Sequence, residues 1–279
     1  MNRSFLSRAL FYLGATTIVV YALFPFVWAG FSSLRSEGGG IYLPGLQSFL
    51  GPLSIKNYVI ILKDPRMLSS CINSIMVAVG TVSLSLLLGS LCAYALSRLP
   101  FRFKQPVLFI TLAMMIFPQV SLLTGLFFLL QITGLYNTRS GLTLTYLVYA
   151  LPLTVLLLRG YFRSLPAELE EAAYIDGAGP LTVFWKILLP LSAPGLFTTT
   201  MLTFIGAWNE FLFALTFTTS DQARTLPVTI STFGSRSYHE IPWGQILAAS
   251  LLVSLPLLLF VAVFQSRIMV GISAGAIRE

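Results

Sequence analysis

The chain has 279 residues, of which 56% are hydrophobic and 10% are charged, and its formal net charge is +7. Soluble domains hold about 25% charged residues, so this composition argues for a membrane protein, with a soluble all-helical protein as the alternative. A single histidine, His239, and the lack of clustered carboxylates argue against a metal site. Basic residues beside anionic lipid explain the positive charge, so no nucleic acid is needed as a partner.

Long uncharged intervals mark the candidate membrane spans. A charge at the bilayer centre costs roughly 2.5 to 3.5 kcal/mol, and a helix needs about 20 apolar residues to cross the hydrocarbon layer. Six intervals of 19 to 34 residues satisfy this requirement, one of them interrupted only by Glu210. We therefore predict an all-α membrane protein with six transmembrane helices, at about 9–31, 74–96, 107–130, 142–158, 196–217 and 246–263.

The first span follows a basic start that contains Arg3 and Arg8, as in a signal peptide. Its apolar run is longer than the usual 7 to 15 residues and no small-x-small cleavage site follows, so we expect a retained helix. The next segment, 32–73, is too short for a separate domain. We therefore expect one transmembrane domain over 1–279, with core helices over about 70–270.

Two polar positions stand out in the third and fourth spans. Gln119 follows Pro118, where a kink could expose polar backbone to a cavity. Tyr149 lies three residues after Tyr146, on the same helix face. Both positions are candidates for contact with a solute, although a structural kink and ordinary packing explain them as well.

The segment 164–194 is charged and lies between apolar runs. Pro166 suits the first turn of a helix, and three acidic residues complement the positive end of its dipole: Glu168, Glu170 and Glu171. Gly177 can adopt the left-handed conformation that ends a helix, and Pro180 can begin a second helix that runs to Pro190. The sequence thus predicts two short helices around a glycine turn.

The faces of this segment suggest a contact with another protein. Ala172 and Ala173 are small enough for a partner to approach the backbone, while Leu169 and Ile175 are expected to pack toward the protein. An ordinary amphipathic helix at the membrane surface is the alternative.

Glu210 is the only charged residue inside the fifth span. A buried, isolated carboxylate is costly, so we expect it to face water, a partner or hydroxyl groups of a solute. Thr199, Thr203 and Gly206 precede it at helical spacing and should face the bundle interior.

The distribution of basic residues sets the orientation. With an even number of spans both termini lie on one side, and that side carries ten basic residues: Arg3, Arg8, Arg98, Arg102, Lys104, Arg159, Arg163, Lys186, Arg267 and Arg278. The other side carries seven over longer loops: Arg35, Lys56, Lys63, Arg66, Arg139, Arg224 and Arg236. Both termini and segment 164–194 are therefore predicted to be cytoplasmic.

Several motifs resemble a known family. Segment 164–194 is similar to the cytoplasmic EAA loop of permease subunits in bacterial ATP-binding-cassette importers, through Glu171-Ala-Ala, Asp176-Gly-Ala178, Phe184, Ile187, Pro190-Leu191 and Pro194. Later stretches resemble the maltose-permease-like second subunit of the carbohydrate branch, namely 208–214, 225–228, 243–245 and 271–276. The resemblance extends over the chain and is most specific from about Ser70 to the end.

The resemblance implies a type I importer permease with no catalytic residue or cofactor of its own. Its EAA loop would form a coupling helix against a cytoplasmic ATPase dimer, through Glu171, Ala172, Ala173, Asp176, Gly177 and Ala178. ATP and Mg²⁺ would bind that ATPase, and this chain has no G-x-x-x-x-G-K-[ST] loop. The tail 267–279 would reach toward the ATPase.

The resemblance also implies a place and further partners. The chain would lie in the bacterial inner membrane beside a second homologous permease, and its outer loop 218–242 would meet an extracytoplasmic sugar-binding protein. The candidate residues lining the path are Trp208, Asn209, Glu210, Gln119 and Tyr149, with Trp208 offering a face for sugar stacking. Maltose, trehalose and other glucosides fit the family. The alternative function is an ion-coupled secondary transporter or a membrane enzyme that uses Glu210.

Overall fold

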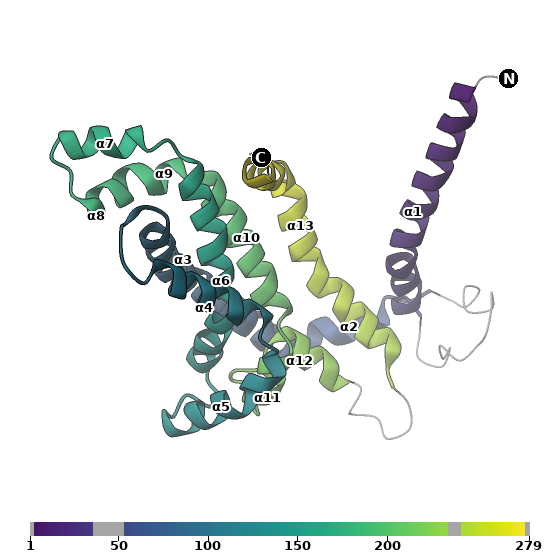
Figure 1. Cartoon of the computed structure of the whole chain (residues 1–279). Helices are drawn as coiled ribbons and strands as arrows, with labels where there is room; N and C mark the ends of the chain where they lie inside the picture. The colour runs from purple at the N-terminus through teal and green to yellow at the C-terminus, as the bar shows by residue number, and fades with distance from the viewer. Residues whose placement is uncertain (1–2, 36–52, 234–240, 277–279) are drawn as a thin grey trace. The chain divides into compact units, whose positions relative to one another are not determined.

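The computed structural model describes residues 3–35, 53–233 and 241–276, and the regular structure in these ranges is helical apart from one bridge between Arg35 and Leu53 (Figure 1). The chain divides into two compact units. One comprises Met1–Met67 and Ile230–Pro256, and the other comprises Leu68–Thr229 and Leu257–Glu279. The single domain predicted for 1–279 stays a prediction.

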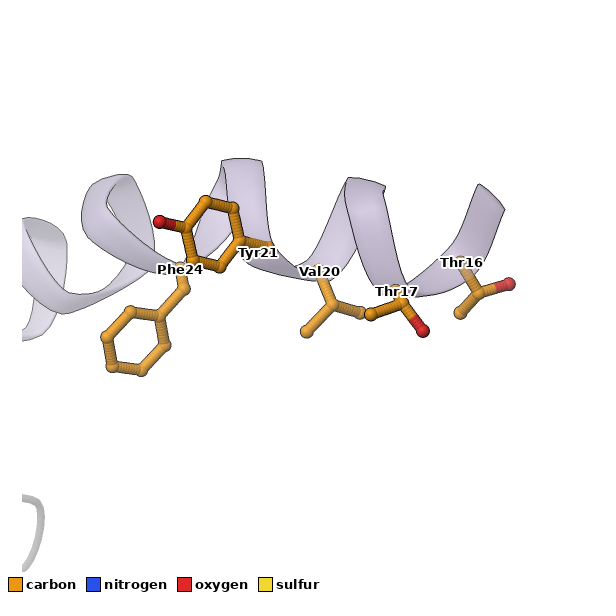
Figure 2. A pocket seen from close by; sticks show the side chains of 5 residues that line it. All are labelled: Thr16, Thr17, Val20, Tyr21 and Phe24. Carbon is orange, nitrogen blue, oxygen red and sulfur yellow. The ribbon is translucent and has the colours of Figure 1, made fainter. Parts of the chain in front are cut away.

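The first unit contains α1 (Arg3–Ser33), α2 (Lys56–Lys63) and the beginning of α13 (Trp243–Ala276). Its small core gathers Ile61, Phe233 and Ala249. The apolar side chains along α1 are exposed, as expected of a helix whose surroundings are lipid. A groove on α1, lined by Thr16, Thr17, Val20, Tyr21 and Phe24, belongs to this one helix (Figure 2).

The second unit holds the remaining helices. They are α3 (Pro65–Arg98), α4 (Lys104–Ile116), α5 (Gln119–Ile132), α6 (Arg139–Ser164), α7 (Glu168–Ile175), α8 (Pro180–Val183), the π-helical turn Phe184–Leu188, α9 (Leu189–Leu191), α10 (Ala193–Asn209), α11 (Leu212–Phe217) and α12 (Leu226–Ser231), of which α3 and α12 extend into the first unit. One core cluster surrounds Tyr146 and Phe213, and a second surrounds Phe162 and Phe184.

Three of the described helices are each long and apolar enough to cross a membrane, namely α1, α3 and α6. Two bent pairs raise this number to at most five if each pair is one span. The all-helical membrane architecture is thus confirmed, and the count of six spans stays a prediction. The predicted span 246–263 lies within α13.

Two predicted spans are broken helices, which corrects the prediction of continuous ones. The span 107–130 divides into α4 and α5, which meet at 103°. Phe117 is extended there, because the ring of Pro118 disfavours the α conformation of the residue before it. The span 196–217 divides at Glu210, which is extended between α10 and α11.

Close packing of α3 against α6 depends on Gly89. A Cβ atom built on Gly89 would lie 2.6 Å from Cγ2 of Thr154. Gly125 on α5 has nothing within 4 Å of the same position. The small residue therefore lets two backbones approach, as is common between membrane helices.

We expect Gly89→Ala to destabilise the protein by about 1 to 3 kcal/mol, because the new methyl group overpacks a tight contact. Gly125→Ala is the matched control. It should be neutral or stabilising by up to about 1 kcal/mol, since alanine favours the helix. Thermal unfolding in detergent measures both, and equal stability of the two variants would contradict the packing argument.

Candidate functional site

Residues Glu168–Leu191 form a hairpin of short helices, which we call the hairpin (Figure 1). Gly177 has φ +82° and follows the last turn of α7, and the Ala178 N–H donates to the Ala173 carbonyl at 2.9 Å. Pro180 is at the start of α8. The predicted pair of helices around a glycine turn is confirmed, with α7 beginning at Glu168 rather than near Pro166.

The second arm of the hairpin contains a π-helical turn, Phe184–Leu188. The N–H of Leu189 donates to the carbonyl of Phe184, five residues earlier. Pro190 follows and has no N–H to donate, which removes a bond that would continue the regular α pattern. The turn keeps Phe184 and Leu188 buried while Trp185 remains half-exposed.

The hairpin exposes four of the six predicted docking residues. Glu171, Ala172, Asp176 and Gly177 are exposed, Ala178 is half-buried, and Ala173 is buried against the core around Phe184. The expectation that Leu169 and Ile175 pack inward is wrong, because they are 41% and 86% exposed. Glu170 and Ala173 form the buried face of α7 instead, and that face turns Ile175 outward.

Several apolar side chains of the hairpin are exposed besides the acidic residues. Five of them are at least 41% exposed: Leu169, Tyr174, Ile175, Leu181 and Trp185. Their exposure does not follow from the sequence. The residues are apolar in the sequence, but only the neighbours of the hairpin decide which of them are covered.

Two residues of α3 hold the hairpin. Arg98 Nε lies 2.6 Å from Oε1 of Glu170, and Arg98 Nη2 donates to the Leu165 carbonyl at 2.6 Å. The Tyr94 hydroxyl donates to the Pro180 carbonyl at 3.1 Å. Burial raises the pKa of Glu170, and the Arg98 guanidinium offsets part of that increase. Glu170 thus anchors α7, a role that its position in an acidic first turn did not reveal.

Glu210 binds backbone of its own chain. Its side chain is buried, and its Oε1 and Oε2 atoms accept from the N–H groups of Phe213 at 2.7 Å and Ala214 at 3.1 Å. These N–H groups belong to the first turn of α11. N–H groups in the first turn of a helix have no carbonyl acceptor within that helix. The carboxylate therefore caps α11, a role that the sequence analysis did not include.

The other candidate path residues have different surroundings. Trp208 is buried and stacks on Phe204 with ring centroids 5.7 Å apart, whereas Asn209 is exposed and donates to the Ile205 carbonyl at 2.9 Å. The rings of Tyr149 and Phe213 have centroids 6.5 Å apart. Tyr149 and Glu210 therefore both contact Phe213, Tyr149 through the ring and Glu210 through the backbone N–H. Gln119 is exposed at the bend where α5 begins.

Some buried polar groups on α6 and α10 have no hydrogen-bond partner among the described residues. They are Tyr149 Oη, Thr199 Oγ1, Thr203 Oγ1 and Trp208 Nε1. Buried polar groups are normally paired, so these atoms make this part of the unit suited to a polar solute or water. Within the described ranges, no group of three or more metal-ligating side chains is found.

Comparison with known proteins agrees with this architecture. Residues 85–270 match the family model described as "Binding-protein-dependent transport system inner membrane component". The trehalose/maltose transport system permease protein MalG of Thermococcus litoralis is 39% identical, with 100% of this chain and 99% of that protein covered. The trehalose transport system permease protein SugB of Mycobacterium tuberculosis is 38% identical, with 97% and 98% covered.

Solved structures show the same fold. A bacterial ABC transporter involved in the import of the acidic polysaccharide alginate matches with a TM-score of 0.80 and 25% identity, over 95% of this chain and 98% of that one. A bacterial alginate ABC transporter in complex with an alginate pentasaccharide-bound periplasmic protein has a TM-score of 0.69 and 14% identity. The match covers 95% of this chain and 96% of that one. The latter likeness concerns the fold alone.

The resemblance to carbohydrate-importer permeases is confirmed by these relatives. The alternative of an ion-coupled transporter or a membrane enzyme is not supported, since the matched family belongs to binding-protein-dependent transport systems. The chain therefore belongs to the binding-protein-dependent transport system inner membrane component family, as a non-catalytic, membrane-spanning permease subunit of an ATP-binding-cassette carbohydrate importer.

Proposed function

We propose that this subunit forms half of a translocation pathway for an oligosaccharide or glucoside, and that a cytoplasmic ATPase dimer docks on the hairpin. The surface of the hairpin carries this proposal. Exposed carboxylates at Glu171 and Asp176 lie in the same short helix and turn as Ile175, which is 86% exposed. Exposed apolar side chains interspersed with carboxylates fit a surface that another protein covers.

The energy for transport would come from the partner. The sequence has no phosphate-binding loop, so ATP and Mg²⁺ would bind the ATPase. Closure of the ATPase dimer would move the hairpin, and the hairpin would move the helices attached to it. The proposed docking residues are Glu171, Ala172, Ala173, Asp176, Gly177 and Ala178. Of these, Ala173 is buried and supports the exposed residues.

Two more proteins complete the proposed complex. A second homologous permease would form the other half of the pathway, and an extracytoplasmic sugar-binding protein would meet loop 218–242, of which 234–240 lie outside the described residues. The matched family is described as binding-protein-dependent, which supports the proposed sugar-binding protein. The tail 267–279 is also proposed to contact the ATPase, and its side chains lie outside the described part of the structure.

The cargo would be a solute with many hydroxyl groups. The relatives are named for trehalose, maltose and, in a protein of Agrobacterium fabrum that is 35% identical with 100% of this chain and 96% of that protein covered, sulfoquinovosyl glycerol. Trp208, Asn209, Glu210, Gln119 and Tyr149 are proposed to line its path. The unpaired polar atoms of Tyr149 and Trp208 support this proposal.

Reconstitution of the complete complex in proteoliposomes tests the proposal. We expect accumulation of labelled trehalose or maltose only when the ATPase subunits, ATP with Mg²⁺, and the cognate binding protein are all present. Binding of each sugar to that external protein, measured alone, identifies the cargo independently. Uptake that persists without any ATPase would contradict the proposed function.

A further inference from the structure

We propose that α3 transmits the movement of the hairpin to residues 218–229, which we call the outer segment. Arg98 and Tyr94 would be the positioning residues at one end of α3, and Asn73 at the other. This inference rests on the proposed docking of an ATPase on the hairpin. The hairpin is joined covalently to α6 and α10, so a mechanical role for α3 depends on its side-chain contacts.

The contacts at the hairpin end reach both arms. Arg98 pairs with Glu170 on α7, and only 16% and 7% of their side chains are exposed. The Tyr94 hydroxyl binds the Pro180 carbonyl at the start of α8, and the Tyr94 ring lies 5.2 Å from that of Phe184. An ion pair shielded from water is screened little by salt. Movement of either arm is therefore passed to the last two turns of α3.

The contacts at the opposite end of α3 reach the outer segment. Asn73 is fully buried, and its Nδ2 donates to the carbonyls of Asp221 at 3.0 Å and Arg224 at 2.9 Å. Ser74 Oγ accepts from the Leu226 N–H at 2.9 Å. Arg139 Nε donates to Asn73 Oδ1 at 2.7 Å and fixes the amide orientation. The outer segment is thus bound to one face of α3 through backbone groups.

Continuity distinguishes α3 from the other helices of this unit. It runs unbroken for 34 residues, with its proline, Pro65, at the first position. By contrast α6 contains Pro152, and α10 ends at Asn209 before the short α11. The 25 residues from Asn73 to Arg98 correspond to about 37 Å at 1.5 Å per residue, more than the hydrocarbon thickness. One rigid element therefore joins groups on the two sides of the membrane.

Two variants break the hairpin end of this connection without adding bulk, Arg98→Gln and Glu170→Gln. In the reconstituted complex we expect the ATPase to remain bound, because the exposed Glu171 and Ile175 are unchanged. Stimulation of ATP hydrolysis by the sugar-loaded binding protein should fall at least tenfold. The double exchange Arg98→Glu with Glu170→Arg should recover most of the stimulation, and Arg102→Gln, an exposed neighbour, is the matched control.

Labelling of the outer segment gives a readout that a merely structural role would not change. Thr219 is exposed, so Thr219→Cys in a Cys71→Ser and Cys92→Ser background can react with a maleimide. We expect a non-hydrolysable ATP analogue to change the labelling rate at position 219 at least threefold in the otherwise unaltered protein. In Glu170→Gln or Asn73→Ala, the rates with and without the analogue should be nearly equal. The proposal is overturned if both variants keep the threefold change, or if the protein without these variants shows no effect of the nucleotide.

The outcomes separate this inference from the proposed function. If Glu170→Gln keeps both the bound ATPase and full stimulation, the role of α3 is refuted while docking on the hairpin stands. If the unaltered hairpin fails to bind the ATPase at all, the proposed function fails first.

Discussion

Glu171→Arg is expected to abolish ATP-driven uptake and to release the ATPase from the complex. The side chain of Glu171 is exposed on α7, beside Ala172 and one turn before Ile175. Reversal of its charge would place a long cation where we propose that a partner surface pairs with a carboxylate. Like charges brought together at an interface cost several kcal/mol, so association should weaken more than about 100-fold.

Membrane insertion should be unaffected by this substitution. Glu171 is exposed, whereas the buried contacts of α7 are made by Glu170 and Ala173. Co-purification of the ATPase with the tagged permease, and uptake by proteoliposomes, measure the two effects separately. Glu168→Arg makes the same charge change outside the predicted docking residues and should cause a smaller loss. An ATPase that stays bound to Glu171→Arg, with uptake intact, would refute the docking site.

Ile175→Ala tests the apolar part of the same surface without altering charge. Ile175 is 86% exposed, so its truncation leaves the core of the second unit intact. Burial of an isoleucine at an interface contributes about 1.5 to 3 kcal/mol, and loss of most of this should weaken ATPase association about tenfold or more.

The hairpin could be predicted from the sequence because its signals are local. Gly177 adopts a positive φ and Pro180 begins a helix, as their covalent structures favour. The direction of its side chains could not be predicted in this way. Tyr94 and Arg98, which cover one face of the hairpin, are about 70 to 90 residues away in the chain. Tertiary contacts at that separation decide that Ala173 is buried and that Ile175 is exposed.

The breaks in the predicted spans show the same limit. Pro118 indicates a kink, but the size of the bend, 103° between α4 and α5, does not follow from a proline in the sequence. At Glu210 no proline or glycine marks the break. A carboxylate within an apolar interval predicts a group that faces water, a partner or a solute, whereas acidic side chains can also accept hydrogen bonds from backbone N–H groups at a helix start.

Glu210→Ala should destabilise the protein by about 2 to 4 kcal/mol, because it leaves two N–H groups, of Phe213 and Ala214, without their acceptors in a buried site. Glu210→Gln keeps one carbonyl oxygen in place and should cost about half as much. Thermal unfolding in detergent measures the difference. Asn209→Ala removes an exposed side chain and should change stability by less than about 0.5 kcal/mol.

Measuring uptake distinguishes the capping role of Glu210 from its proposed role in lining the path. A residue that only caps α11 affects transport through folding, so Glu210→Gln at a temperature where it is fully folded would transport at the unaltered rate. Contact with the sugar predicts a loss of at least tenfold under the same conditions, because an amide replaces a charged acceptor of hydroxyl hydrogen bonds. We expect the loss, since the carboxylate lies beside Phe213 and Tyr149, where an unpaired phenolic hydroxyl is also buried. If both Glu210→Gln and Glu210→Ala leave uptake unchanged, Glu210 has the structural role alone.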